Sequence, residues 1–116
     1  MPSPSPVVAN TTPWISLGEV GLLGTFHSLY GNLWIPQAVF DEFQVGIPSH
    51  PQRPDLTSLA WVTVHPAPVD PTVPLFLDAG EREAIALARA VQARVVFIDE
   101  KQGHAVARRL NLPLAG

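Results

Sequence analysis

Short apolar runs that end in a polar residue and lead into a helix recur along this chain, and they limit the possible folds more than any other feature. Val7–Ala9 is followed by Asn10, and Val95–Ile98 is followed by Asp99. Leu33–Ile35 is a further apolar run, followed by Pro36. Runs that are apolar throughout are typical of strands buried on both faces of a parallel sheet. We therefore predict an α/β domain in which helices cover both faces of the sheet.

Helix signals follow these runs. Thr12 is a suitable N-cap and Pro13 suits the first helical position, so we predict a helix that starts there. We also predict a helix over Leu22–Tyr30, closed by Gly31. The further helices expected from capping and apolar periodicity are one opened by Pro36 that buries Val39, Phe40 and Phe43, one over Leu75–Ala93, and one over Glu100–Leu110 that turns Ala105, Val106 and Leu110 inward.

The stretch from 46 to 74 differs from the rest, because it holds seven of the thirteen prolines. We predict a long excursion over the surface, with one strand at Trp61–Val64 and one helical turn near Leu56–Leu59. The 116 residues are enough for a single domain, with residues 1–6 expected to be disordered.

Composition excludes several classes of protein. The chain has no cysteine, which rules out disulfides, zinc–thiolate sites and cysteine nucleophiles and fits a reducing cytoplasm, our predicted location. No apolar run is long enough to cross a bilayer. The chain is 47% hydrophobic and 15% charged, so we expect a partner to cover apolar surface, most simply in a homodimer.

Four segments each place an oxygen-rich side chain where the carboxyl ends of parallel strands should lie. Asn10 and Asp99 follow strands; Glu81 borders the buried stripe of its helix, whereas Glu83 falls further round; Glu42 lies nearer the buried face than Asp41 does. Each residue also has a structural explanation. Asp99 suits a capping box, acids in a first helical turn complement the helix dipole, and Glu42 suits a solvated flank.

Taken together, these side chains predict a metal site. Oxygen ligands without cysteine favour a hard cation, Mg²⁺ or Mn²⁺. Clustered carboxylates repel one another unless a cation neutralises them. Such an ion suits the hydrolysis of phosphodiesters, because it activates the attacking water and stabilises the developing charge.

The ordered segments VVANTTP, IPQAVFDEF, GEREAIALARA and VVFIDEKQGHAVARRLNLP resemble the PIN-domain family. The closest likeness is to a VapC-like prokaryotic branch of predicted nucleic-acid-binding proteins. The resemblance implies a three-layer α/β/α sandwich around a mainly parallel sheet of four or five strands. It also implies a Mg²⁺ or Mn²⁺ ribonuclease site whose acidic positions fall on Asn10, Glu42, Glu81 and Asp99, with Glu83 as a supplement and Thr12 as a hydroxyl neighbour.

The chain departs from the family pattern in two places. Asn10 supplies an amide oxygen but no negative charge. Relatives usually continue beyond LNLPLAG, so we expect a final strand and a covering helix to be missing here, which would expose a sheet edge.

Three functions follow from these residues. The first is a metal-dependent endoribonuclease, the toxin of a toxin–antitoxin pair, with Glu42, Glu81 and Asp99 catalytic. RNA would be its substrate and a small antitoxin its partner, and Lys101, Arg108 and Arg109 could contact phosphates, although a solvated helix face is the commoner role. The alternative is a PIN fold with little or no catalysis that binds protein or RNA. An unrelated nucleotide-binding module is disfavoured, because no glycine-rich phosphate loop is present.

Overall fold

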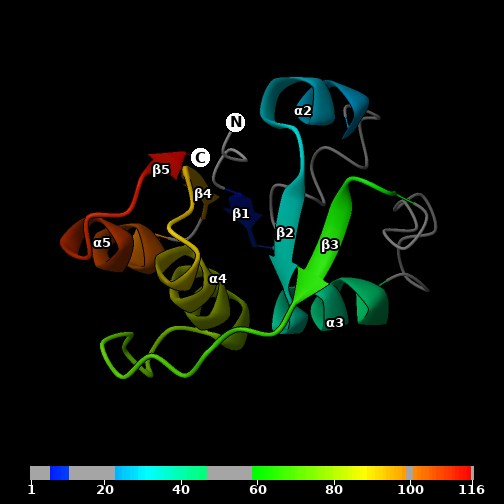
Figure 1. Ribbon diagram of the computed structural model, residues 1–116. Coiled ribbons are helices and arrows are strands. Elements are labelled where there is room, and N and C mark those ends of the chain that lie inside the picture. Colours follow the sequence, from blue (N-terminus) through cyan, green and yellow to red (C-terminus); the bar gives the residue numbers. More distant parts are fainter. Residues whose placement is uncertain (1–5, 11–22, 47–58, 99–100, 116) are drawn as a thin grey trace.

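The computed structural model describes residues 6–10, 23–46, 59–98 and 101–115 (Figure 1). The predicted helix after Thr12 and the predicted turn near Leu56–Leu59 lie outside these residues. Within the described part of the chain, no helix is long and apolar enough to cross a membrane.

The centre of the molecule is a five-stranded sheet in the order β3-β2-β1-β4-β5. Every pair of neighbouring strands is parallel, which confirms the predicted parallel sheet. The strands are β1 (Val7–Ala9), β2 (Leu33–Pro36), β3 (Val62–His65), β4 (Val95–Phe97) and β5 (Leu114–Ala115).

The described helices are α2 (Leu23–Tyr30), α3 (Gln37–Gly46), α4 (Ala79–Ala90) and α5 (Lys101–Arg109). In Figure 1, α2 lies beyond the amino ends of β2 and β3, whereas α3 lies beyond their carboxyl ends, beside the first turn of α4. α3 directly follows β2 and so begins at the carboxyl end of that strand, and the first turn of α4 lies beside α3 there.

The core forms on both faces of the sheet because successive residues of a strand point to opposite faces. Val7 and Ala9 of β1 pack with Val39 and Phe43 of α3 in one apolar cluster. Val8 packs in the other cluster, with residues of α4 and α5. The fold is therefore the predicted three-layer α/β/α sandwich.

Some predicted boundaries were wrong. Pro36 ends β2 in register with His65 instead of opening α3, because its ring favours extended backbone in the residue before it. The fourth predicted helix starts at Ala79 and not at Leu75. Its N-cap is Asp78, whose side chain accepts a hydrogen bond from the Glu81 N–H at 2.8 Å. The helix therefore begins directly after Asp78, although apolar residues precede it.

The last predicted helix and the end of the sheet also differ from expectation. Ala105 is exposed, whereas Ala107 is buried. A final strand is present, because Leu114–Ala115 pairs with β4. β5 and β3 form the two edges of the described sheet.

The cap of α4 gives a test of this fold. Replacement Asp78→Ala should lower the free energy of unfolding by about 1 kcal/mol, because the Glu81 N–H loses its acceptor. Urea unfolding measures the change. Asp78→Ser keeps an acceptor and should retain most of the stability; an equal loss in both variants would show that the side-chain cap is not what stabilises α4.

Candidate functional site

Asn10 lies at the carboxyl end of β1. Its backbone N–H donates to the carbonyl of Phe97 at 3.1 Å, which continues the pairing of β1 with β4 by one residue. The alternation of side chains along an extended strand puts Asn10 on the same face as Val8, the face that α4 covers. Asn10 is only 5% exposed, so a buried amide lies at this edge of the sheet, directly after β1.

Glu81 lies in the first turn of α4 and is also 5% exposed. Its Oε2 would be only 3.1 Å from a Cβ at Gly103, and the same Cβ would be 2.7 Å from Cγ2 of Ile98. The first turn of α5 thus packs against both Glu81 and the residue that follows β4. Because Asn10 is bonded to Phe97, the immediate neighbour of Ile98, Glu81 and Asn10 are brought to the same edge.

Asn10 and Glu81 are the two polar or charged residues that are buried among the residues the structure describes. Burial of a carboxylate is costly unless positive charge or hydrogen-bond donors compensate it. The positive potential at the start of α4 lowers that cost for Glu81. Two buried oxygen-bearing side chains at the carboxyl edge of a parallel sheet therefore mark this edge as the candidate site.

Glu42 approaches the same region from α3. Although the residue is exposed, its carboxylate oxygens lie 3.4 and 3.5 Å from the position that a Cβ would occupy at Gly80. Gly80 immediately precedes Glu81 in α4. The Glu42 carboxylate therefore lies against the first turn of α4, beside the backbone that leads into Glu81.

Glu83 points in a different direction from Glu81. Its Oε1 accepts a hydrogen bond from the N–H of Ala38 at 3.0 Å. Ala38 is in the first turn of α3, where backbone N–H groups have no partner within the helix. Glu83 thus caps α3 from a neighbouring helix, and one of its oxygens is already engaged.

The other predicted site residues are placed less directly. Asp99 and Thr12 lie outside the described residues, and the side chain of Lys101 is likewise not described. Arg108 and Arg109 are exposed in the last turn of α5, at the end of that helix farther from α3 in Figure 1. Among the described residues, no three His, Cys, Asp or Glu side chains form a group that could hold a metal.

Sequence reasoning missed three residues that shape this edge. Gly80 lies against the Glu42 carboxylate, Gly103 makes room for the Glu81 carboxylate, and the Nε2 of His104 forms a hydrogen bond with the carbonyl of Ile98. That bond fixes the backbone where the chain leaves β4. The only sequence signal was a glycine beside Glu81 and another beside His104, and glycine has too many roles for such a signal to be specific.

Two histidines stack on tryptophans. His65 stacks on Trp34 with ring centroids 3.6 Å apart, and His27 stacks on Trp61 at 4.6 Å. Burial lowers the pKa of His65 below its usual value. The charged ring is therefore less favoured here than in a free histidine.

A family model described as a PIN domain matches residues 6–116. The chain belongs to the PIN-domain family. This confirms the family resemblance found in the sequence and gives the chain a nuclease-type fold associated with nucleic-acid binding. No curated protein and no solved structure matched the chain significantly. The closer likeness to the VapC-like branch stays a prediction.

The two glycines of the site provide a matched test. Gly103→Ala should reduce stability, because the added Cβ would overlap Ile98, a residue without exposed surface, and crowd Glu81. Overpacking of this kind costs about 1–3 kcal/mol, which outweighs a gain in helix propensity of up to about 1 kcal/mol.

Gly80→Ala is the control, because its added Cβ would make ordinary contacts at 3.4 Å. It should leave the free energy of unfolding unchanged or raise it. Thermal and urea unfolding of the two variants decide the matter. A Gly103→Ala variant as stable as Gly80→Ala would mean that α5 does not pack closely on Glu81 and Ile98.

Proposed function

We propose that this PIN domain is a metal-dependent endoribonuclease, with RNA as its substrate. One observation carries the proposal. Asn10 and Glu81 are the two buried polar side chains among the described residues. Both carry oxygen atoms that can bind a metal ion, and both lie at the same edge of the sheet. They are also residues at which the sequence predicts metal ligands.

The residues present fit a hard divalent cation, Mg²⁺ or Mn²⁺. Asn10, Glu42, Glu81 and Asp99 would hold the ion, and the space left by Gly103 allows the Glu81 carboxylate to lie close to α5. When bound, the ion supplies an acidified water and stabilises charge that develops on a phosphate. Glu83 could supplement the site only with the oxygen that does not bind Ala38.

The protein's own contribution is orientation. Packing of Gly103 against Glu81 and Ile98 restricts the movement of the Glu81 carboxylate. The backbone hydrogen bond from Asn10 to Phe97 fixes the position of Asn10 at the edge of the sheet. Glu42 and Asp99 would complete the proposed set of carboxylates that hold the ion, with Thr12 as a hydroxyl neighbour. A rigid set of acids of this kind would keep the ion in a fixed position relative to a bound phosphodiester.

The amide at position 10 lowers the negative charge of the site. On this proposal, Asn10→Asp should tighten Mn²⁺ binding about tenfold or more, because affinity for hard cations rises with ligand charge. Glu81→Gln and Asp99→Asn should each weaken binding by a similar factor or abolish it. Isothermal titration calorimetry with Mn²⁺ measures these changes.

Asp41→Asn is the matched control, because Asp41 is an exposed neighbour of Glu42 whose carboxylate binds the side chain of Gln37. This variant should bind Mn²⁺ as the parent does. Equal Mn²⁺ affinity in the parent, Asn10→Asp and Glu81→Gln would rule out a metal site at this edge.

The wider role that we propose is that of a toxin held inactive by a small antitoxin protein, with the toxin as a homodimer. The neutral amide of Asn10 favours a second candidate, a PIN fold that binds RNA or protein with little catalysis. Cleavage of single-stranded RNA with Mn²⁺, lost in Glu81→Gln, supports the nuclease. Mn²⁺ and RNA binding without cleavage in both the parent and Asn10→Asp supports the second candidate.

A further inference from the structure

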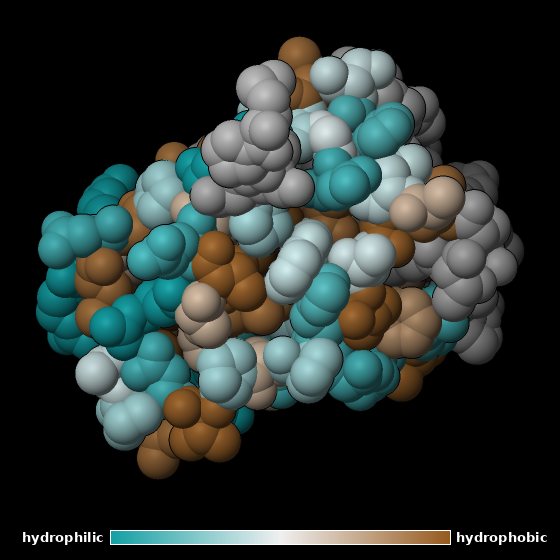
Figure 2. All heavy atoms as spheres, in the orientation of Figure 1, coloured by the Kyte–Doolittle hydropathy of each residue, from teal (hydrophilic) through white to brown (hydrophobic). Residues whose placement is uncertain are grey.

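The loop between β3 and α4, residues 66–78, holds three of the five exposed large apolar side chains among the described residues. Val69 is 97% exposed, Leu75 84% and Phe76 65%. Figure 2 shows hydrophobic residues at the lower left of the molecule, where Figure 1 places this loop. Apolar side chains gathered at one place on a surface are typical of an interaction site.

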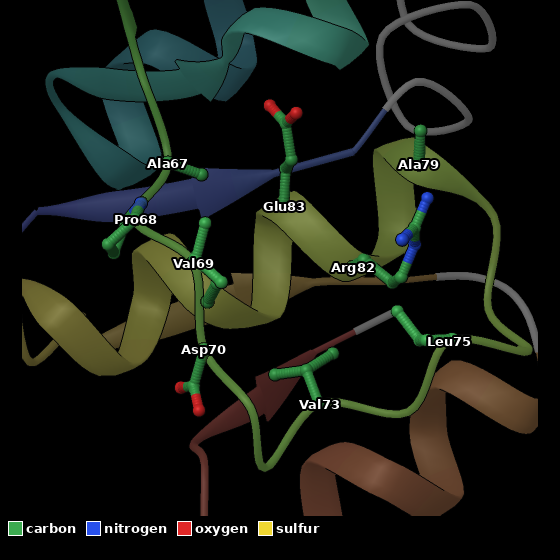
Figure 3. Close-up of a pocket in the computed structure, with 10 residues that line it drawn as sticks. Ala67, Pro68, Val69, Asp70, Val73, Leu75, Ala79, Arg82 and Glu83 are labelled. Carbon is green, nitrogen blue, oxygen red and sulfur yellow. The ribbon is translucent and has the colours of Figure 1, made fainter.

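A pocket separates this loop from α4. Val69, Val73 and Leu75 line it from the loop, and Ala79, Arg82 and Ala86 line it from the helix (Figure 3). Its volume is about 210 Å³, which is below the roughly 300–1,000 Å³ of sites for small molecules and cofactors. The space fits one or two side chains of a polypeptide better than a free ligand.

The charged residues around the pocket differ in how far other residues of the chain already engage them. Asp70 accepts a hydrogen bond from Thr72 and is paired with Arg89 at 2.7 Å, and these contacts hold the pKa of Asp70 below its usual value. Glu83 also lines the pocket, but its carboxylate extends away from the loop and caps α3 (Figure 3).

Arg82 differs from these two acids. Its Nε is buried and has no hydrogen-bond partner within the part of the chain that the structure describes. The side chain lies between Ala79 and Leu75 at the margin of the pocket (Figure 3). A carboxylate is the group that best complements a guanidinium in such an apolar setting.

A nucleic acid is a poor fit for the same surface. Arg89 is occupied by Asp70, so Arg82 is the one cation among the lining residues left to meet a ligand, whereas a chain of phosphates needs several. A single guanidinium among apolar side chains suits an occupant with one negative charge and an apolar body.

We propose that the β3–α4 loop and α4 form a docking surface for a partner protein, which inserts an apolar side chain into the pocket and a carboxylate against Arg82. Arg82 directly follows Glu81 in the sequence, so the bound segment would border the candidate metal edge. The proposal goes beyond the proposed function, because docking requires neither the metal nor catalysis.

The probe is a panel of short synthetic helical peptides, each with leucine and phenylalanine on one face and one glutamate at varied spacing from them. Every peptide is also made with glutamine in place of the glutamate. Fluorescence anisotropy with the full chain should show a glutamate peptide that binds about tenfold tighter than its glutamine form, as expected for a hydrogen bond to a charged group.

Two variants locate the binding. Arg82→Gln should remove the preference for glutamate, and Leu75→Ser should weaken both forms of the peptide. Arg108→Gln and Val45→Ser are matched controls, because both residues are exposed and lie on α5 and α3, away from the pocket. Circular dichroism and urea unfolding confirm that each variant is folded.

The proposal is overturned if no peptide of the panel binds, if the glutamate and glutamine forms bind equally, or if Arg82→Gln keeps the preference. It is also overturned if a single-stranded RNA oligonucleotide, and no peptide, loses affinity in Arg82→Gln. A self-association that Leu75→Ser abolishes, without peptide binding, would assign the surface to a second copy of this chain instead.

Discussion

The parallel pairing of β1 with β4 determines how the rest of this edge is arranged. Because the N–H of Asn10 bonds to the carbonyl of Phe97, a residue near the start of the chain lies beside the end of a strand that follows α4. The helices on the two faces of the sheet then bring Glu81 and Glu42 to the same place, with Gly80 and Gly103 as the points of close approach. A shift of this pairing by one residue would turn Asn10 to the face that α3 covers.

Three consecutive residues of α4 illustrate how one helical turn supports several contacts. Successive side chains point about 100° apart around a helix. Glu81 therefore faces the ends of the strands, Arg82 faces the β3–α4 loop, and Glu83 reaches the first turn of α3. The same turn thus links the candidate metal edge, the proposed docking surface and the packing of α3 on α4.

Much of the fold could be predicted from the sequence, because strands such as β1 and β4 are apolar throughout and end at residues that break them. The burial of Glu81 also followed from its spacing to the apolar face of its helix. The rest depends on tertiary contacts. The start of α4 depends on the Asp78 cap, the role of Glu83 on an amide 45 residues earlier in the chain, and the packing around Glu81 on a glycine in α5.

The most direct test of the central claim is Mn²⁺-induced line broadening in the ¹⁵N spectrum of the protein, because a paramagnetic ion broadens the signals of nearby amides first. At low Mn²⁺, the account predicts early loss of the amide signals of Asn10, Glu81 and Gly103, while those of Arg108 and Arg109 persist. Loss that begins around Asp70, or that is uniform over the surface, would contradict a metal site at the carboxyl edge of the sheet.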